Sequence, residues 1–154
     1  MHTFDKNIKD LDIIIPDIAT PIANYVPYKL INNILYISGQ APSKDGNMIY
    51  KGKVGVDISE KEGIKAAELC CINIIAILKN VIDADWECLD SFVKLGGFVS
   101  CKEDFTNHPK IINGASNLLV NIFGEQGKHA RFAVGSSSLP MNVAVEIDAI
   151  IKIR

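Results

Sequence analysis

The chain has 154 residues, 48% of them hydrophobic, with 16 basic and 18 acidic side chains. Domains usually hold roughly 100–200 residues, so we expect one domain over residues 1–154, large enough to fold without disulfides. The net charge of −2 offers no basic surface for a phosphate backbone, which disfavours nucleic acid as a partner.

The sequence carries no membrane-spanning or targeting pattern. The longest apolar run, Ile72 to Leu78, contains Asn73 and is far shorter than the ~18 residues of a spanning helix. The first residues resemble neither a signal nor a transit peptide, so we expect a cytoplasmic protein. Cys70 and Cys71 are adjacent and no C-x-x-C pair occurs, which favours reduced thiols over disulfides or a zinc site.

The first half of the chain predicts an extension, a hairpin and a helix. Residues 1–24 form an N-terminal extension that we expect to be loosely organised and to cover an edge, because prolines interrupt its short apolar pieces. Residues 34–38 have strand composition, and Asp45-Gly46 is a typical turn before residues 48–50. Ser59 and Glu62 have capping-box spacing, which predicts a helix from about Glu60 to Lys79.

The second half predicts a strand, a helix and two further strands. Residues 92–100 resemble a strand, and Pro109 with later apolar spacing predicts a helix over 108–123. Strict alternation from Val143 to Ile153 predicts a final strand, preceded by one that begins near Arg131. This order favours an α+β fold with both helices on one face of a mixed sheet. The other face would stay half-apolar, so we expect self-association.

The segment from Ala130 to Ile147 holds the strongest candidates for chemistry. An arginine near the start of a strand, as predicted for Arg131, is suited to a small carboxylate because its guanidinium donates two parallel, charge-assisted hydrogen bonds. Glu146 falls in the next strand. The alternative interpretation is a structural ion pair between Arg131 and Glu146, the commoner role for such residues in a sheet.

The chain resembles the Rid family (RidA/YjgF) of reactive-intermediate deaminases over most of its length. The most specific part is the spaced set Ala130-Arg131, Leu139-Pro140 and Val145-Glu146-Ile147. The other matching positions are Tyr25, Ser38-Gly39-Gln40-Ala41-Pro42, Asn73, Leu78, the strand from Val93 to Val99, and Asn113.

The resemblance implies a chorismate-mutase-like fold and a homotrimer with active sites between subunits, without metal or cofactor. Better-known members hydrolyse enamines and imines such as 2-aminoacrylate to 2-keto acids and ammonia. By position, Arg131 would anchor the substrate carboxylate, Glu146 would hold or polarise the attacking water, and Tyr25 would close the pocket. The remaining substrate-binding positions implied by the resemblance are Ser38, Gly39, Asn113 and the backbone at Ala133.

The sequence also departs from the family pattern, as in a longer, divergent branch. His129 stands where proline or alanine is usual, and Ala133 where cysteine is frequent. We expect His108 and His129 to be exposed or structural, and Cys101 to be the thiol most open to oxidation. Two alternatives to the deaminase remain: a non-catalytic protein that binds small carboxylates, and an endoribonuclease or translation-inhibitor-like protein.

Overall fold

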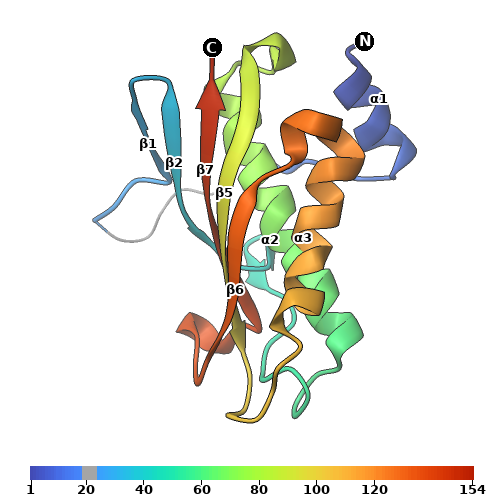
Figure 1. Cartoon of the computed structure of the whole chain (residues 1–154), viewed down its shortest axis with the longest axis vertical. Helices are drawn as coiled ribbons and strands as arrows, with labels where there is room; N and C mark the ends of the chain where they lie inside the picture. The colour runs from blue at the N-terminus through green and yellow to red at the C-terminus, as the bar shows by residue number, and fades with distance from the viewer. Residues whose placement is uncertain (19–23) are drawn as a thin grey trace.

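In the computed structural model, which describes residues 1–18 and 24–154, two long helices cover one face of a mixed sheet (Figure 1). Within these residues the main sheet has five strands in the order β1-β2-β7-β5-β6, and β3 and β4 form a small separate hairpin. The strands are β1 Tyr28–Ile31, β2 Ile34–Gln40, β3 Ser43–Lys44, β4 Asn47–Met48, β5 Leu89–Ser100, β6 Ala130–Ser136 and β7 Val145–Ile153. The α+β fold with both helices on one face is therefore as predicted.

The sheet is mixed because only one neighbouring pair of strands is parallel. Strands β5 and β6 run parallel, whereas the β1–β2, β2–β7 and β5–β7 pairs are antiparallel. A parallel pair requires a long crossover, which helix α3 provides between the two strands. Strand β6 lies at the edge of the sheet, next to α3, and β5 separates it from β7.

Both long helices begin where the sequence predicts. Helix α2, Glu60–Val81, has the expected capping box, in which Ser59 accepts from the Glu62 amide and the Glu62 carboxylate accepts from the Ser59 amide. Helix α3, His108–Phe123, has Pro109 in its first turn. The short 3-10 helices are η1 Trp86–Cys88, η2 Gly124–Gly127 and η3 Pro140–Asn142.

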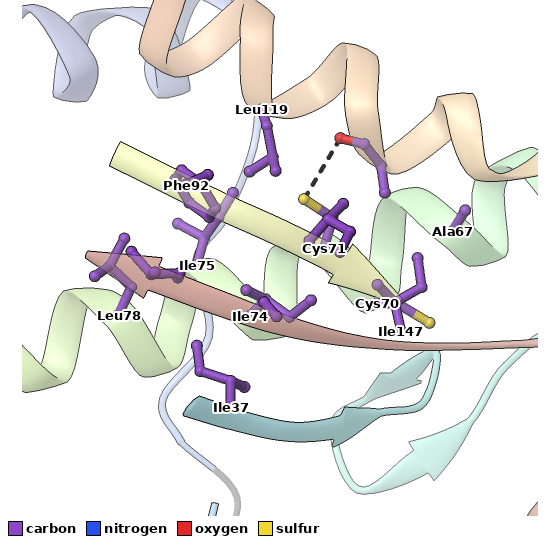
Figure 2. Close-up of a cluster of buried hydrophobic side chains, with 14 of the residues drawn as sticks. Ile37, Ala67, Cys70, Cys71, Ile74, Ile75, Leu78, Phe92, Leu119 and Ile147 are labelled. Atoms are coloured by element: carbon purple, nitrogen blue, oxygen red, sulfur yellow. Dashed lines mark hydrogen bonds between the residues drawn. The ribbon is translucent and has the colours of Figure 1, made fainter. Parts of the chain in front are cut away.

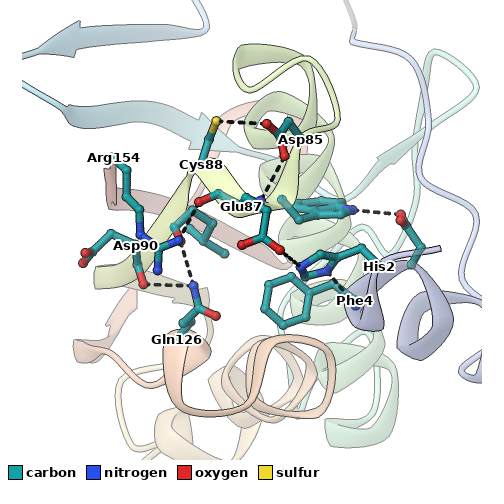
Figure 3. Close-up of polar contacts among 11 residues, drawn as sticks. His2, Phe4, Asp85, Glu87, Cys88, Asp90, Gln126 and Arg154 are labelled. Carbon is teal, nitrogen blue, oxygen red and sulfur yellow. Dashed lines mark hydrogen bonds and ion pairs between the residues drawn. The ribbon is translucent and has the colours of Figure 1, made fainter.

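The N-terminal segment is better ordered than predicted, because it begins with helix α1, Thr3–Asp10. The Phe4 ring packs edge-on against Trp86 and Phe123, with centroids 6.2 and 5.0 Å away. The Trp86 indole donates to Asp5 over 2.8 Å, and His2 contacts Glu87 at 3.3 Å (Figure 3). Helix α1 therefore packs on α3 and η1 and does not cover a sheet edge.

Side chains of α2 fill the space between the helices and the sheet (Figure 2). Ile74 and Leu78 are fully buried, as are the adjacent Cys70 and Cys71. All four cysteines are free, as predicted, and burial raises the pKa of the Cys70 and Cys71 thiols well above the usual range. None of the described helices is long and apolar enough to span a bilayer.

The sheet face opposite the helices carries apolar side chains that nothing in the described chain covers. Tyr36, Phe98 and Val134 are 45%, 38% and 42% exposed. They come from β2, β5 and β6, so the apolar surface crosses the sheet. We refer to this surface, with the outward residues of β7, as the open sheet face.

Candidate functional site

The predicted site residues fall into two groups on opposite faces of the sheet. Arg131 pairs with Leu95, which is buried beneath the helices, whereas Glu146 pairs with the exposed Phe98. Residues paired across a ladder point to the same face, so Arg131 lies on the helix side and Glu146 on the open sheet face. The ion pair of the alternative interpretation therefore does not form within one chain.

Arg131 projects from the edge strand β6 onto α3, where two acceptors hold its guanidinium. Its Nη1 donates to the Ser116 hydroxyl over 3.0 Å, and its Nη2 donates to the Pro109 carbonyl over 3.3 Å. A guanidinium has five N–H donors, and the remaining three have no hydrogen-bond partner among residues 1–18 and 24–154. The group is thus fixed on its α3 side and half-exposed, with donors left for a ligand.

His129 extends this network behind Arg131. Its Nδ1 lies 2.7 Å from the Gly127 carbonyl, which can only accept, so Nδ1 carries the proton. Its Nε2 is then an acceptor for the Ser116 hydroxyl, 2.9 Å away. Burial lowers the pKa of His129 below its usual 6.5, and the Arg131 charge adds to this while the Gly127 hydrogen bond opposes it. His129 is a half-buried, neutral member of the arginine site.

Two further predicted residues lie near this arginine site without a direct hydrogen bond to the guanidinium. Ala133 follows two residues along β6, points to the same face and packs against the core. Asn113 is exposed on α3, four residues after Pro109 and three before Ser116, a spacing that puts all three on one side of the helix. Asn113 also lines a groove of about 450 Å³ between α2 and α3, beside Leu118.

The second group gathers around Glu146 on the open sheet face. Gly39 of β2 lies so close that a Cβ there would overlap the Glu146 carboxylate, so a larger residue at this position would force that carboxylate to move. Glu146 is half-buried, and this burial raises the pKa of its carboxyl above the usual 4.5, with the negative charge of Asp148 adding to the shift. A carboxyl with a raised pKa is a stronger base than an ordinary surface glutamate.

Tyr25 and Ser38 lie beside strands β1 and β2, at the edge of the sheet. Both line a shallow hollow of about 430 Å³ with Tyr28 and Tyr36. The Ser38 hydroxyl donates to the Val26 carbonyl over 2.7 Å, which leaves its oxygen free only as an acceptor. Tyr25 is 58% exposed, so its ring is available to another surface.

The structure also shows a pair that the sequence did not indicate. The Cys101 sulfur lies 3.4 Å from His108 Nε2, and Gly135 packs against both. Cys101 is only 5% exposed, and burial raises the pKa of its thiol. The prediction that Cys101 is the thiol most open to oxidation is therefore wrong, because residues of β6 and α3 cover its sulfur.

Neither Ser116 nor His129 was predicted to belong to the site. Their only sequence signals are a histidine at an unusual position two residues before Arg131 and a serine on the predicted second helix. The link between them depends on α3 lying beside the edge strand, which is a tertiary contact.

Comparisons with known proteins cover almost the whole chain. Residues 7–151 match the family described as "YjgF/chorismate mutase-like, putative endoribonuclease". The crystal structure of Atu1372 from Agrobacterium tumefaciens, described as of unknown function, matches with a TM-score of 0.93 and 41% identity, covering 99% of this chain and 93% of that chain. A putative endoribonuclease from Shewanella oneidensis MR-1 matches with a TM-score of 0.93 and 30% identity, covering 98% and 99%. Protein TCP17 of Trypanosoma cruzi is 36% identical over 149 residues, 96% of this chain and 92% of its own length.

Proposed function

Because the chain belongs to the YjgF/Rid family, we propose that it hydrolyses small enamines and imines of the 2-aminoacrylate type to 2-keto acids and ammonia. The observation that carries this proposal is the Arg131 guanidinium, held by Ser116 and the Pro109 carbonyl, with three N–H donors that have no partner in the described part of the chain. Such a group suits the carboxylate that imino acids, enamino acids and keto acids share.

The arginine site accounts for substrate capture. A hydrogen-bonded charged contact contributes about 1.5–3 kcal/mol, which corresponds to roughly 10- to 150-fold in affinity. Lysine would replace the planar fork by a single point charge, so it should recover little of this affinity. Asn113 and the backbone at Ala133 would add hydrogen bonds on the same side of the fold.

The Glu146 group would supply the hydrolytic step. An enamine first becomes an imine by taking a proton on carbon and losing one from nitrogen. Glu146 then accepts a proton from water as the water oxygen bonds to the imine carbon, the C=N electron pair moves to nitrogen, and the protonated Glu146 returns that proton to the nitrogen. The hydroxyl proton of the carbinolamine passes to the same nitrogen through Glu146 as the C–N bond breaks, so ammonia leaves and the carbonyl forms. Tyr25 would close over the substrate, while Ser38 and Gly39 would line the part of the pocket that holds the attacking water.

A complete site requires a second copy of the chain, because Arg131 and Glu146 lie on opposite faces of one sheet. We therefore propose a homotrimer in which the open sheet faces pack together and bring the Glu146 group of one subunit to the arginine site of another. In this trimer the exposed side chains of Tyr36, Phe98 and Val134 would be buried between the subunits and stabilise the association.

A second candidate is a protein that binds small carboxylates without turning them over. It is favoured by the position of Arg131, which has no ion pair with a carboxylate among the residues that the structure describes and is sufficient by itself to bind an acid. It predicts the same dependence of binding on Arg131, but no release of ammonia.

The test generates imino acids in place with an amino-acid oxidase while semicarbazide competes for the imine. The wild-type protein should lower semicarbazone formation and speed the release of ammonia, and Arg131→Ala should lose both effects. Arg154→Ala is the matched control, because Arg154 is the chain's other arginine and donates to the Glu87 carbonyl. If the wild type changes neither rate across several side chains, the deaminase proposal fails. Calorimetry with a 2-keto acid then tests the binding alternative.

A further inference from the structure

We propose that Ser116 and His129 are positioning residues that orient the Arg131 guanidinium and so set the affinity of the arginine site for carboxylates. This inference rests on the proposed role of Arg131 and assigns its geometry to two side chains outside the family-derived set. Neither residue needs to touch the substrate, since both act through the guanidinium.

The hydrogen bonds form one directed chain. The His129 Nδ1–H donates to the Gly127 carbonyl at 2.7 Å, which leaves Nε2 as an acceptor. Ser116 donates its only proton to that Nε2 over 2.9 Å, so its oxygen lone pairs face Arg131 and accept from Nη1 over 3.0 Å. Each hydrogen bond thus has only one possible donor and one possible acceptor. The imidazole takes the Ser116 proton, so the serine oxygen is oriented to accept from Arg131.

This arrangement matters because arginine has a long, flexible side chain. Binding would otherwise have to immobilise it, which lowers affinity. Ser116 and the Pro109 carbonyl hold Nη1 and Nη2 before a ligand arrives, and they occupy the α3 side of the guanidinium. The unused donors are therefore presented on the side away from α3, where a carboxylate can approach.

Protonation of His129 would remove the hydrogen bond that orients Ser116 toward Arg131. An imidazolium has two N–H donors and no acceptor, so the Ser116 proton would lose its partner and a second positive charge would stand near Arg131. Charged groups on the neighbouring elements include Lys128, paired with Glu125 of η2, Lys94 of β5, whose ammonium lies over the Phe132 ring, Lys110 of α3, paired with Glu60, and Asp90 of β5, paired with Lys152. From α3, the group that faces His129 is the neutral Ser116 hydroxyl.

The experiment measures the Kd of 2-oxobutyrate by calorimetry, together with KM and kcat, from pH 5 to 8. Ser116→Ala and His129→Ala should weaken binding and raise KM by roughly 2- to 10-fold at pH 8, the effect of one hydrogen bond, with kcat nearly unchanged. Ser116→Thr keeps the hydroxyl and should restore the affinity. His129→Gln keeps an acceptor and a donor without titrating, so it should bind as the wild type at pH 8 and lose less affinity at pH 5.

Ser91→Ala is the matched control, since the Ser91 hydroxyl donates to Asp90 on another part of the sheet. The positioning role would be overturned if Ser116→Ala left the Kd unchanged. It would also be overturned if Ser116→Thr kept the wild-type Tm but failed to restore the affinity. If the wild type binds 2-oxobutyrate but releases no ammonia, the deaminase proposal fails and the Kd series still decides the inference. Absence of 2-oxobutyrate binding by the wild type, together with no effect on ammonia release, overturns both.

Discussion

Substitution of Gly114 by alanine tests how closely the two long helices approach each other. Gly114 lies on α3, where a Cβ would overlap the Ile64 carbonyl oxygen of α2, about an ångström inside ordinary contact. Alanine is favoured over glycine in a helix interior by about 1 kcal/mol. Overpacking costs about 1–3 kcal/mol, and the upper end applies because a backbone oxygen cannot swing away. We therefore expect Gly114→Ala to destabilise the protein by about 1–2 kcal/mol.

Gly63→Ala is the matched control, because Gly63 lies on α2 at the same helix interface. There a Cβ would meet side-chain atoms only, at 3.0 Å from Val54 Cγ2 and 3.3 Å from Ile111 Cδ1. A shift of a few tenths of an ångström relieves these contacts, so the gain in helix propensity should offset the cost to within about 1 kcal/mol.

Thermal unfolding followed by circular dichroism, at one fixed protein concentration, measures the difference. At about 2–4 °C per kcal/mol for a chain of this size, Gly114→Ala should lower Tm by about 2–8 °C, while Gly63→Ala should stay near the wild type. Gly114 is two residues from Ser116, so moving α3 should also raise KM. Equal Tm values for Gly114→Ala and the wild type would refute the argument, because the predicted overlap would then have no energetic consequence.

Three further predictions concern titratable side chains. Glu146→Gln should lower kcat by about 100-fold or more and remove the acid limb of the rate profile, which in the wild type should lie above pH 4.5 because the pKa of Glu146 is raised. The raised pKa of Glu146 also affects stability: its contribution is present below about pH 4.5 and is lost as the pH rises through the pKa of the folded protein. In urea unfolding, the free energy of unfolding of Glu146→Gln relative to that of the wild type should therefore be higher at pH 7 than at pH 4. Titration of the native protein with a thiol reagent should label the half-exposed Cys88 well before the buried Cys101, and Cys88→Ser should remove the fast phase. Rapid labelling that persists in Cys88→Ser would contradict the burial of Cys101.

The sequence predicted most elements because their signals are local. The capping box of Ser59 and Glu62 and the alternation that ends at Ile153 involve residues only a few positions apart, and both elements form as expected. Helix α1 was missed because it is eight residues long and buries only Phe4 and Ile8, too few for a helical period. Its stability comes from contacts with Trp86 and Phe123, which are remote in sequence.

For the candidate site, the residue types could be predicted from the sequence: an arginine suited to carboxylates at position 131 and a carboxylate at position 146. It did not determine which face each occupies, because β5, from earlier in the chain, inserts between β6 and β7 and sets the register of both. Nor did it link Ser116 to Arg131, since that contact exists only where α3 packs beside the edge strand. Local spacing determines which way a side chain points from its own element, whereas the pairing of distant strands decides what it meets.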